Sequence, residues 1–599
     1  MTRHRSGIRW SLMSIALAAL TTLACSWAYA GGPLIVNNGH AVRWSRVEVR
    51  GGPLNSQTVD QSGRVLYRVD SGPLGPLNNT HAAALVDRIF KLYTDIPTAD
   101  IEFLNAGSIL DPTTGNPADV NGTNVGKFLS GKNPTFQNPI IFDSDGSITG
   151  GGGVLGFFGF LQTDDPLSPS ELREGFVVLN GSPLTRRTIS TTSFLGVFTH
   201  EFGHFAGPLD HAQINGNIAS NGKGSILPSG FTEAQAFDLY APFTETLFPF
   251  IFDGPRGSQL ADQFKDSGFF VATLDLDTQN ALSNLYPAPD YLASRGSLEG
   301  RVLFKLGATE IPISGINVIA RRIDQGAYPP PEGTTAFPSA PTVDSDGVPQ
   351  LPPAQGATDS LATVASAVTG LDFGSGTYRI QGLPAGQYLV EIQQINPDAI
   401  AGSGIGPLRN PFTLPVKEEF FNGSENSSNS SSVFMPVTVS AGQLTSGIDL
   451  IINGVSTGPP ALVDEREPND KTKKAQRLEI PAEVSASAAD TDDSLLRMSL
   501  PDGSRDPIED LYRITVDQTR IVFIILEATS GSGDLDLYLF TSGVSKKRSS
   551  LDDPNLLTFS TGPTANEFIG FQLDPGDYFI GVSAFSGNLN YKLRMVASQ

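Results

Sequence analysis

The chain has 599 residues, a formal net charge of −22, one cysteine and six histidines. This length exceeds what one hydrophobic core holds, because domains usually have about 100–200 residues, so about three domains are expected. The acidic charge disfavours nucleic acid as a partner, since phosphate binding needs a basic face. The 63 glycines and 43 prolines favour turn-rich β structure over long helices.

Residues 1–30 have the pattern of an export signal. Three arginines precede an uncharged apolar run over 11–23, and Ala28-Tyr29-Ala30 supplies a small-x-small site with cleavage before Gly31. We therefore expect a bacterial protein that is secreted or periplasmic. No later apolar run of about 18 residues follows, so no membrane span is expected.

The single cysteine, Cys25, lies inside this signal. A lipid anchor on Cys25 at the outer surface is the alternative, but Thr22 stands where a lipobox has Leu. With cleavage before Gly31 no cysteine remains, so the exported chain would hold no disulfide.

Residues 31–296 mix helical and strand-like patterns. The apolar positions after Thr80 repeat with a period near 3.6, and 193–205 is a second helical pattern. For the β-branched run at 174–179 two placements are open: an interior strand, or an edge that pairs with an extended peptide. The expected elements in chain order are a strand at 64–69, a helix capped by Thr80, strands at 99–103 and 174–179, and helices at 193–205 and 278–286.

Residues 297–599 are predicted to form mainly β structure. Residues 297–455 contain short strands separated by Gly and Pro, and 326–366 is a Pro-rich insertion predicted to be a long loop. Residues 456–466 are predicted to be a linker. In 467–599, Asp534 to Leu539 alternate polar and apolar side chains, as a half-buried strand does.

The chemistry concentrates in residues 200–211, which hold three of the six histidines. His200 and His204 are four residues apart, so on a helix they face the same side and can bind one Zn²⁺. Glu201 can act as a general base on water and pass the proton to a leaving amine. Gly207 permits a chain reversal and Pro208 cannot continue the helix, so a third ligand can follow while a fourth position stays open.

This pattern resembles the metzincin metallopeptidases, and among them the matrixins, whose motif is HExxHxxGxxH. The third histidine, His211, comes one residue late, and Asp210 occupies the strict position. We favour His211 as third ligand, because Leu209-Asp210-His211 is similar to the Leu-Asp-His run of matrixins with Pro208 inserted. Asp210 is the alternative ligand. The resemblance implies zinc-dependent hydrolysis of peptide bonds.

Two further features belong to the same region. The methionine that underlies the metal in this family is replaced, with Leu247 as the expected equivalent of similar volume. Asp143 and Asp145, at alternate positions, could be ligands of a structural Ca²⁺, with a solvated turn as the alternative.

The C-terminal parts also resemble known modules. Residues 297–455 are similar to carboxypeptidase-regulatory or prealbumin-like β-sandwiches through the stretch 382–388, and 467–599 are similar to bacterial pre-peptidase C-terminal domains. The resemblances imply a multidomain chain, with an α+β metzincin-like catalytic domain followed by two all-β sandwich domains that bind cell surfaces or polymers.

The function expected from these patterns is that of a secreted zinc metalloendopeptidase acting on polypeptides. The alternative is an exported surface or matrix-binding protein whose metzincin-like domain is inactive. A zinc amidase acting on small molecules or cell-wall peptides is a third hypothesis.

Overall fold

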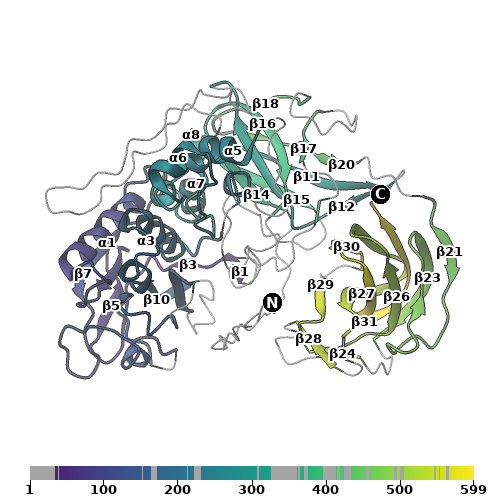
Figure 1. The fold of residues 1–599 in the computed structure, drawn as a ribbon, viewed down its shortest axis with the longest axis horizontal. Coiled ribbons are helices and arrows are strands. Elements are labelled where there is room, and N and C mark those ends of the chain that lie inside the picture. The colour runs from purple at the N-terminus through teal and green to yellow at the C-terminus, as the bar shows by residue number, and fades with distance from the viewer. Residues whose placement is uncertain are drawn as a thin grey trace.

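The computed structural model has three successive parts (Figure 1). It describes most of residues 34–598. Outside the described residues lie 1–33, with the predicted export signal, and 326–360, with most of the predicted insertion. Further gaps include 163–170, 221–230, 370–375, 396–412, 424–432, 454–457, 491–495 and 500–504.

The first part, here called the α/β region, is built on a sheet with strand order β3-β10-β8-β6-β5-β4, to which β7 and β9 add. The predicted strand at 64–69 is confirmed as β6, but the strand predicted from Ala99 begins only at Phe103, because Ala99 instead bridges to Pro287. The strands are β3 (Arg43–Trp44), β4 (Val49–Gly51), β5 (Ser56–Val59), β6 (Val65–Val69), β7 (Phe103–Ser108), β8 (Pro139–Asp143), β9 (Gly156–Gln162) and β10 (Glu171–Asn180), preceded by the hairpin β1 (Val36–Asn37) and β2 (His40–Ala41).

The run at 174–179 lies within β10, which is an interior strand. On one side β10 pairs in parallel with β8 and β3, and on the other side it pairs antiparallel with β9. Among the described residues β9 pairs with β10 alone, so β9 rather than β10 is an edge of this sheet.

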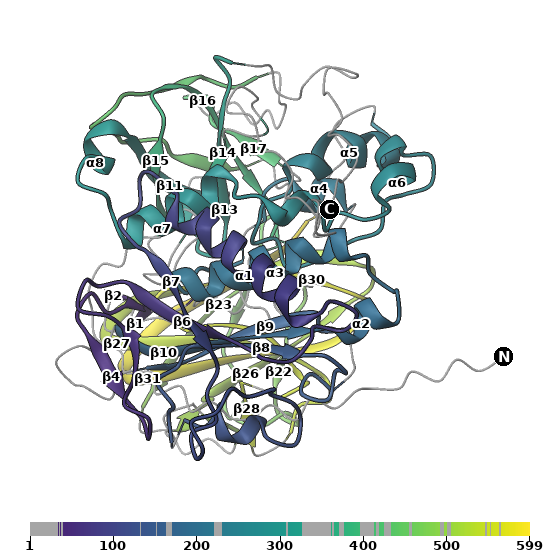
Figure 2. The same cartoon turned by 90° about the vertical axis from the view of Figure 1, so that its left-hand side faces the viewer.

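Helices α1 (Asn79–Thr94) and α3 (Thr191–Ala206) cover one face of the sheet (Figure 2). The N-cap of α1 is Asn78, two residues before the predicted Thr80, and its side chain accepts a hydrogen bond from the amide of His81. The two helices meet through stacked rings of Phe90 and Phe202, 4.3 Å apart. The other helices are α2 (Ser182–Thr185), α4 (Gly216–Ala219), α5 (Glu233–Tyr240), α6 (Gln259–Phe264), α7 (Leu276–Leu285) and α8 (Tyr291–Ser294).

The second part, here called the first β domain, is a sandwich of two five-stranded sheets. One sheet centres on β11, the other has the order β14-β13-β16-β17, and their apolar side chains form one core. The strands are β11 (Gly296–Leu306), β12 (Thr309–Pro312), β13 (Asn317–Arg322), β14 (Val364–Val368), β15 (Thr377–Leu383), β16 (Gly386–Gln393), β17 (Glu418–Phe420), β18 (Val437–Val439), β19 (Leu444–Thr445) and β20 (Leu450–Ile452).

The third part, here called the C-terminal β domain, packs an eight-stranded and a three-stranded sheet. Its first strand, β21, falls inside the predicted linker 456–466, because Ala461–Asp464 pair in parallel with β23. The strands are β21 (Ala461–Asp464), β22 (Gln476–Arg477), β23 (Ala482–Ala489), β24 (Arg497–Ser499), β25 (Arg505–Pro507), β26 (Asp510–Val516), β27 (Arg520–Thr541), β28 (Arg548–Ser550), β29 (Leu556–Ser560), β30 (Glu567–Leu573) and β31 (Gly576–Ala597).

The alternating stretch from Asp534 lies in β27, as predicted, but both of its faces are buried. Asp536 and Tyr538, expected to face solvent, lie beneath the three-stranded sheet, and the Tyr538 hydroxyl donates to Asp506 at 2.6 Å. Alternation predicted the strand, whereas the second covering sheet is a tertiary feature.

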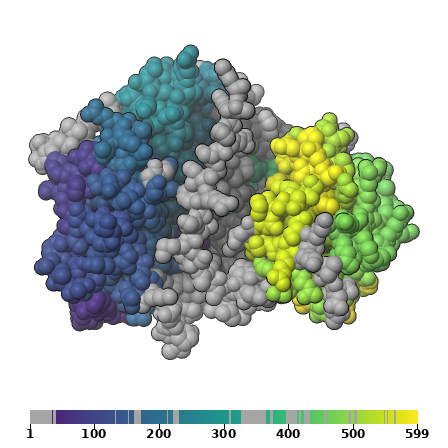
Figure 3. Space-filling model, turned by 60° about the horizontal axis from the view of Figure 1, so that its bottom comes forward, coloured from purple at the N-terminus to yellow at the C-terminus, as the bar shows by residue number. Residues whose placement is uncertain are grey.

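The first β domain lies between the two other parts. The rings of Phe304 in β11 and Phe523 in β27 are 4.8 Å apart, so the two β domains share apolar contacts. The α/β region, purple to blue, and the C-terminal β domain, yellow to green, lie on opposite sides of the molecule (Figure 3). Among the described residues, no helix is long and apolar enough to cross a membrane.

Candidate metal centre

Helix α3 carries His200, Glu201 and His204 through the interior of the α/β region. Its N-cap, Ser190, accepts a hydrogen bond from the amide of Ser193, and most of its side chains are buried. The hydroxyl of Tyr93 in α1 donates to the carbonyl of Thr199 at 2.7 Å, which ties α1 to the turn that holds His200.

The helix ends at Gly207, where the chain turns. Gly207 has φ −151°, so the turn does not use the left-handed conformation that only glycine readily adopts. A side chain at this position is excluded by steric overlap, because an added Cβ would lie 2.8 Å from Leu282 and 2.9 Å from Leu285 of α7. Gly207 therefore lets the turn pack against α7.

After this turn, His211 comes to lie beside the two histidines of α3. Each of the three offers one ring nitrogen, and these nitrogens all lie within 4.8 Å of one another. The ring centroids of His200 and His204 are 4.7 Å apart, those of His204 and His211 also 4.7 Å, and those of His200 and His211 5.2 Å. His204 is buried and the other two are half-buried, so the group could bind a metal ion.

In His200 and His204, Nδ1 makes a hydrogen bond to the backbone, and the two Nε2 atoms face each other. Nδ1 of His200 is 3.1 Å from the carbonyl oxygen of Thr246, and Nδ1 of His204 is 2.6 Å from that of Leu209. Because a carbonyl only accepts, each Nδ1 carries the proton and each Nε2 keeps a lone pair. These two Nε2 atoms are 3.1 Å apart.

Two lone pairs at this distance repel each other unless a cation lies between them. Burial lowers the pKa of His200 to about 3, with His211 adding to the effect, and burial also places the pKa of His204 far below its ordinary value. The imidazoles of His200 and His204 are therefore neutral near pH 7, which is the form that binds metals. This donor set fits Zn²⁺, which favours neutral imidazole nitrogens.

Glu201, next to His200 in the chain, points toward the start of β9. It is 7 % exposed, and burial raises its pKa to about 8. A Cβ added at Gly156 would lie 2.7 Å from Cγ of Glu201, so the backbone of β9 passes directly beside this side chain.

Asp210, the alternative third ligand, is not part of the cluster of ring nitrogens. It is 3 % exposed, and its Oδ1 lies 3.9 Å from Nδ1 of His211. Burial raises the pKa of Asp210 well above its ordinary value, and the amide of His211 partly offsets this. The carboxylate of Asp210 thus lies beside the ring of His211 and outside the group of three candidate ligand atoms.

Leu247 lies against α3 on the turn between the two helical histidines. It is fully buried, and its Cδ2 is 2.6 Å from the place where a Cβ of Gly203 would be. The preceding residue, Thr246, supplies the carbonyl that accepts from His200. Backbone carbonyl partners such as those of Thr246 and Leu209 have no side-chain signature, so the sequence could not reveal them.

The carboxylate of Asp143, a predicted calcium ligand, is engaged within its own loop. Asp143 is fully buried and accepts from the amides of Ile148 and Thr149, while Asp145 accepts from the amide of Ser147. A Ca²⁺ ion at these residues stays a prediction.

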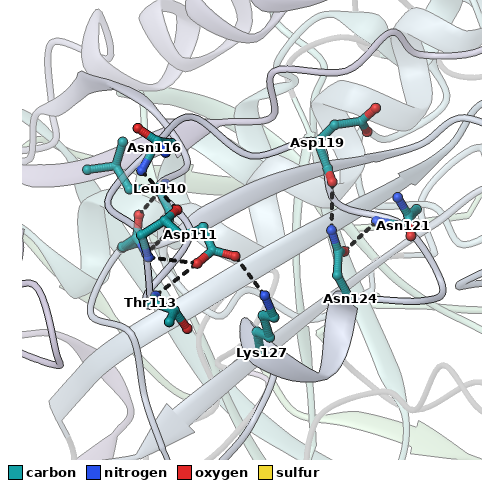
Figure 4. A network of polar contacts seen from close by, with 10 residues as sticks. Leu110, Asp111, Thr113, Asn116, Asp119, Asn121, Asn124 and Lys127 are labelled. Carbon is teal, nitrogen blue, oxygen red and sulfur yellow. Dashed lines mark hydrogen bonds and ion pairs between the residues drawn. The ribbon is translucent and has the colours of Figure 1, made fainter.

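The nearby connection from β7 to β8 is also held by internal contacts (Figure 4). Lys127 pairs with Asp111 at 2.8 Å and lowers the pKa of that carboxyl to about 2, helped by two loop amides. Asn124 donates to the carbonyl of Asp119 at 2.8 Å. The charge of Asp111 is thus balanced by Lys127 of the same connection.

A second group of candidate ligands, which the sequence did not reveal, lies in the C-terminal β domain. Ligand oxygens of Glu465, Glu467 and Asp510 lie within 4.8 Å of one another. The two glutamates alternate along the chain, but Asp510 reaches them only through the sheet, so no local spacing signals the group.

Comparisons with known proteins give distant similarities in structure. No family model matches the chain, and no curated protein matches it. The chain is similar to the pre-peptidase C-terminal domain of a collagenase from Bacillus anthracis, with 17% identity, 22% of this chain and 99% of that chain covered, and a TM-score of 0.16. It is also similar to a putative carbohydrate-binding protein from Pseudomonas aeruginosa (11% identity, 27% and 90% covered, TM-score 0.13) and to the major pilin SpaD from Corynebacterium diphtheriae (11%, 51% and 57%, TM-score 0.13).

Proposed function

We propose that the chain is an exported zinc metalloendopeptidase, in which His200, His204 and His211 hold the ion and Glu201 is the general base. One observation carries the proposal. Three imidazole nitrogens lie within 4.8 Å of one another, and a buried glutamate directly follows the first of these histidines. A purely structural zinc site would not explain why a buried glutamate lies next to the histidines.

The proposed roles follow from the positions of the side chains. When bound, Zn²⁺ supplies Lewis-acid chemistry, because it lowers the pKa of water and polarises a carbonyl. Glu201 takes a proton from the attacking water and delivers it to the leaving amine. Burial makes the ionised form of the Glu201 carboxylate a stronger base than that of an exposed glutamate.

The edge of β9 is the proposed binding surface for the polypeptide substrate. An extended peptide can add to a free sheet edge through main-chain hydrogen bonds. Gly156, at the start of β9, touches Glu201, and the ring centroids of Phe158 and His204 are 6.5 Å apart. A peptide that pairs with β9 would therefore pass beside the histidine cluster.

The proposed domain organisation keeps the boundaries expected from the sequence, except for the linker. The signal covers 1–30, the catalytic domain 31–296, and the first β domain 297–455. The linker is shortened to 456–460, since β21 begins at Ala461. The two β domains are proposed to bind cell surfaces or polymers.

The test uses the mature chain from Gly31 with casein as substrate. Glu201→Gln keeps the shape of the side chain but removes the base, and Glu102→Gln changes an exposed glutamate as the matched control. We expect about one zinc per chain in all three proteins and cleavage by the wild type and Glu102→Gln. Glu201→Gln should lose about 10²–10⁴-fold in rate, and a chelator should abolish cleavage.

The other outcomes discriminate between the hypotheses. Zinc without cleavage of casein would favour the exported binding protein with an inactive metzincin-like domain. A folded chain that binds no zinc after reconstitution would overturn the metallopeptidase. Cleavage that persists in Glu201→Gln would assign the general base to another residue.

A further inference from the structure

The sheet face that the first β domain turns toward the α/β region carries apolar side chains, with Ile319 and Val364 packed against Ile214, as well as charged ones. On this face Arg321 of β13 and Glu391 of β16 form an ion pair in which both side chains are fully buried, with Nε and Oε1 2.7 Å apart. A buried pair of this kind contributes little net stability, because desolvation offsets the attraction. Stability alone therefore does not account for this ion pair, and we ask what Arg321 contacts in the α/β region.

Arg321 reaches across the interface to the segment that follows His211. Its Nη1 donates to Oδ1 of Asn215 at 2.8 Å. Asn215 has φ 60° and in turn donates from Nδ2 to the carbonyl of Phe243 at 2.7 Å. One side chain of the β domain thus fixes two segments, the one after His211 and the one that leads to Thr246.

A second link starts at β14 of the same sheet. The amide of Ser366 donates to Oδ1 of Asp277 at 2.6 Å. Asp277 lies next to Glu245, and burial, together with the charge of Asp277, raises the pKa of Glu245 well above its ordinary value. Oε2 of Glu245 accepts from the amide of Ile214 at 2.9 Å.

Both links end at the backbone that orients the histidines. Glu245 directly precedes Thr246, whose carbonyl accepts from Nδ1 of His200. Ile214 and Asn215 follow His211 by three and four residues. Partners that orient ligand imidazoles typically change metal affinity by about 10–100-fold when they are lost.

We propose that the first β domain positions the metal centre, with Arg321 acting as a positioning residue through Asn215. The domain then holds the metal centre in place in addition to its proposed binding role. This inference rests on the proposed metal centre, but not on peptide hydrolysis.

The decisive variant is Arg321→Met/Glu391→Leu in the full mature chain. Removing both charges leaves no unpaired buried ion, so the sandwich should fold. The matched control is Arg322→Met/Asp324→Leu, which removes the neighbouring ion pair of β13, with both side chains partly exposed. The measurements are the Zn²⁺ dissociation constant, from competition with a chromogenic chelator, and hydrogen exchange of residues 209–219 and 241–248 without metal.

We expect the first variant to bind Zn²⁺ about 10–100-fold more weakly and to exchange faster in both segments. The control should match the wild type in both measurements. Trp44, the only tryptophan after residue 31, reports whether the α/β region is folded. Wild-type affinity and wild-type exchange in the first variant would overturn the inference.

A second variant covers the case in which the charge replacement does not fold. Asn215→Gly accepts the positive φ without strain and removes the bond from Arg321 together with the bonds that Asn215 donates to the carbonyls of Phe243 and Leu361. Weaker zinc binding and faster exchange of the two segments support the inference, and wild-type values overturn it. If the wild type binds no zinc, the proposed function fails, and hydrogen exchange still decides whether the β domain holds these segments.

Discussion

Gly156 and Glu201 lie in direct contact although 45 residues separate them in the chain. A Cβ added at Gly156 would be 2.7 Å from Cγ and 2.9 Å from Oε1 of Glu201. Real Cβ atoms do not approach other atoms so closely, so any larger residue at 156 must displace the glutamate. The position of Glu201, the proposed base, therefore depends on the absence of a side chain at Gly156 in β9, the strand whose edge is the proposed substrate-binding surface.

Gly156→Ala is expected to lower the rate of peptide cleavage about 10²-fold, because a displacement near 1 Å is enough for such a loss. Zinc content should not change, since the histidines are not displaced. Gly153→Ala is the matched control, because nothing lies within 4 Å of its added Cβ. Equal rates for the two variants would show that Glu201 is not the group that β9 constrains.

Removal of the metal is expected to destabilise the α/β region. A ligand at 1,000 times its dissociation constant stabilises a fold by about 4 kcal/mol. A chelator should therefore lower the Tm of the Trp44 fluorescence transition by on the order of 10 °C. Trp44 reports on the site because its Nε1 donates to the carbonyl of Phe205, in the last turn of α3, at 2.7 Å.

The same measurement assigns the third ligand. In His211→Ala the chelator should have little further effect on Tm, whereas Asp210→Ala should keep most of the wild-type shift. The opposite result would give the ligand role to Asp210.

Leu247→Ala is expected to destabilise the α/β region by about 2–5 kcal/mol, because it leaves a cavity under α3. Leu247→Met, which conserves volume, should cost less than about 1.5 kcal/mol. Urea unfolding followed by Trp44 fluorescence gives both values. A large loss in Leu247→Met would mean that the branched shape, rather than the volume, fits against Gly203.

Stability of the α/β region is expected to fall as pH rises from about 4 to 7 through Asp70. This carboxyl is 2 % exposed, and burial raises its pKa from 3.8 to about 7 despite hydrogen bonds from the amides of Gly72, Phe142 and Val120. The unfolded chain loses this proton first, so its contribution to stability is complete at low pH and disappears as pH passes the folded pKa. Other buried acids add to the slope.

Asp70→Asn isolates this contribution. The variant should be less stable at every pH, because its amide group faces amide donors, but its stability should depend less on pH. Urea unfolding at pH 5 and pH 8, followed by Trp44, gives the two slopes. A variant with the same slope as the wild type would show that the amide hydrogen bonds cancel the effect of burial.

The sequence alone determined the local part of the site. Two histidines four residues apart face the same side of a helix because the helical period fixes this, and the helical pattern at 193–205 predicted that helix. The same periodicity predicted the buried positions of α1 from Leu85 to Tyr93. The succession of an α/β region and two β domains was also predicted from turn density and strand-like patterns.

Only the tertiary structure decided the contacts that give the site its geometry. The start of the strand near residue 99, the interior position of β10, the second covering sheet over β27 and the place of His211 all depend on segments far apart in the chain. So do the carbonyl of Thr246 beneath His200 and the link from Arg321 to Asn215. A local pattern records which face of an element is apolar, but packing between distant elements selects what that face meets.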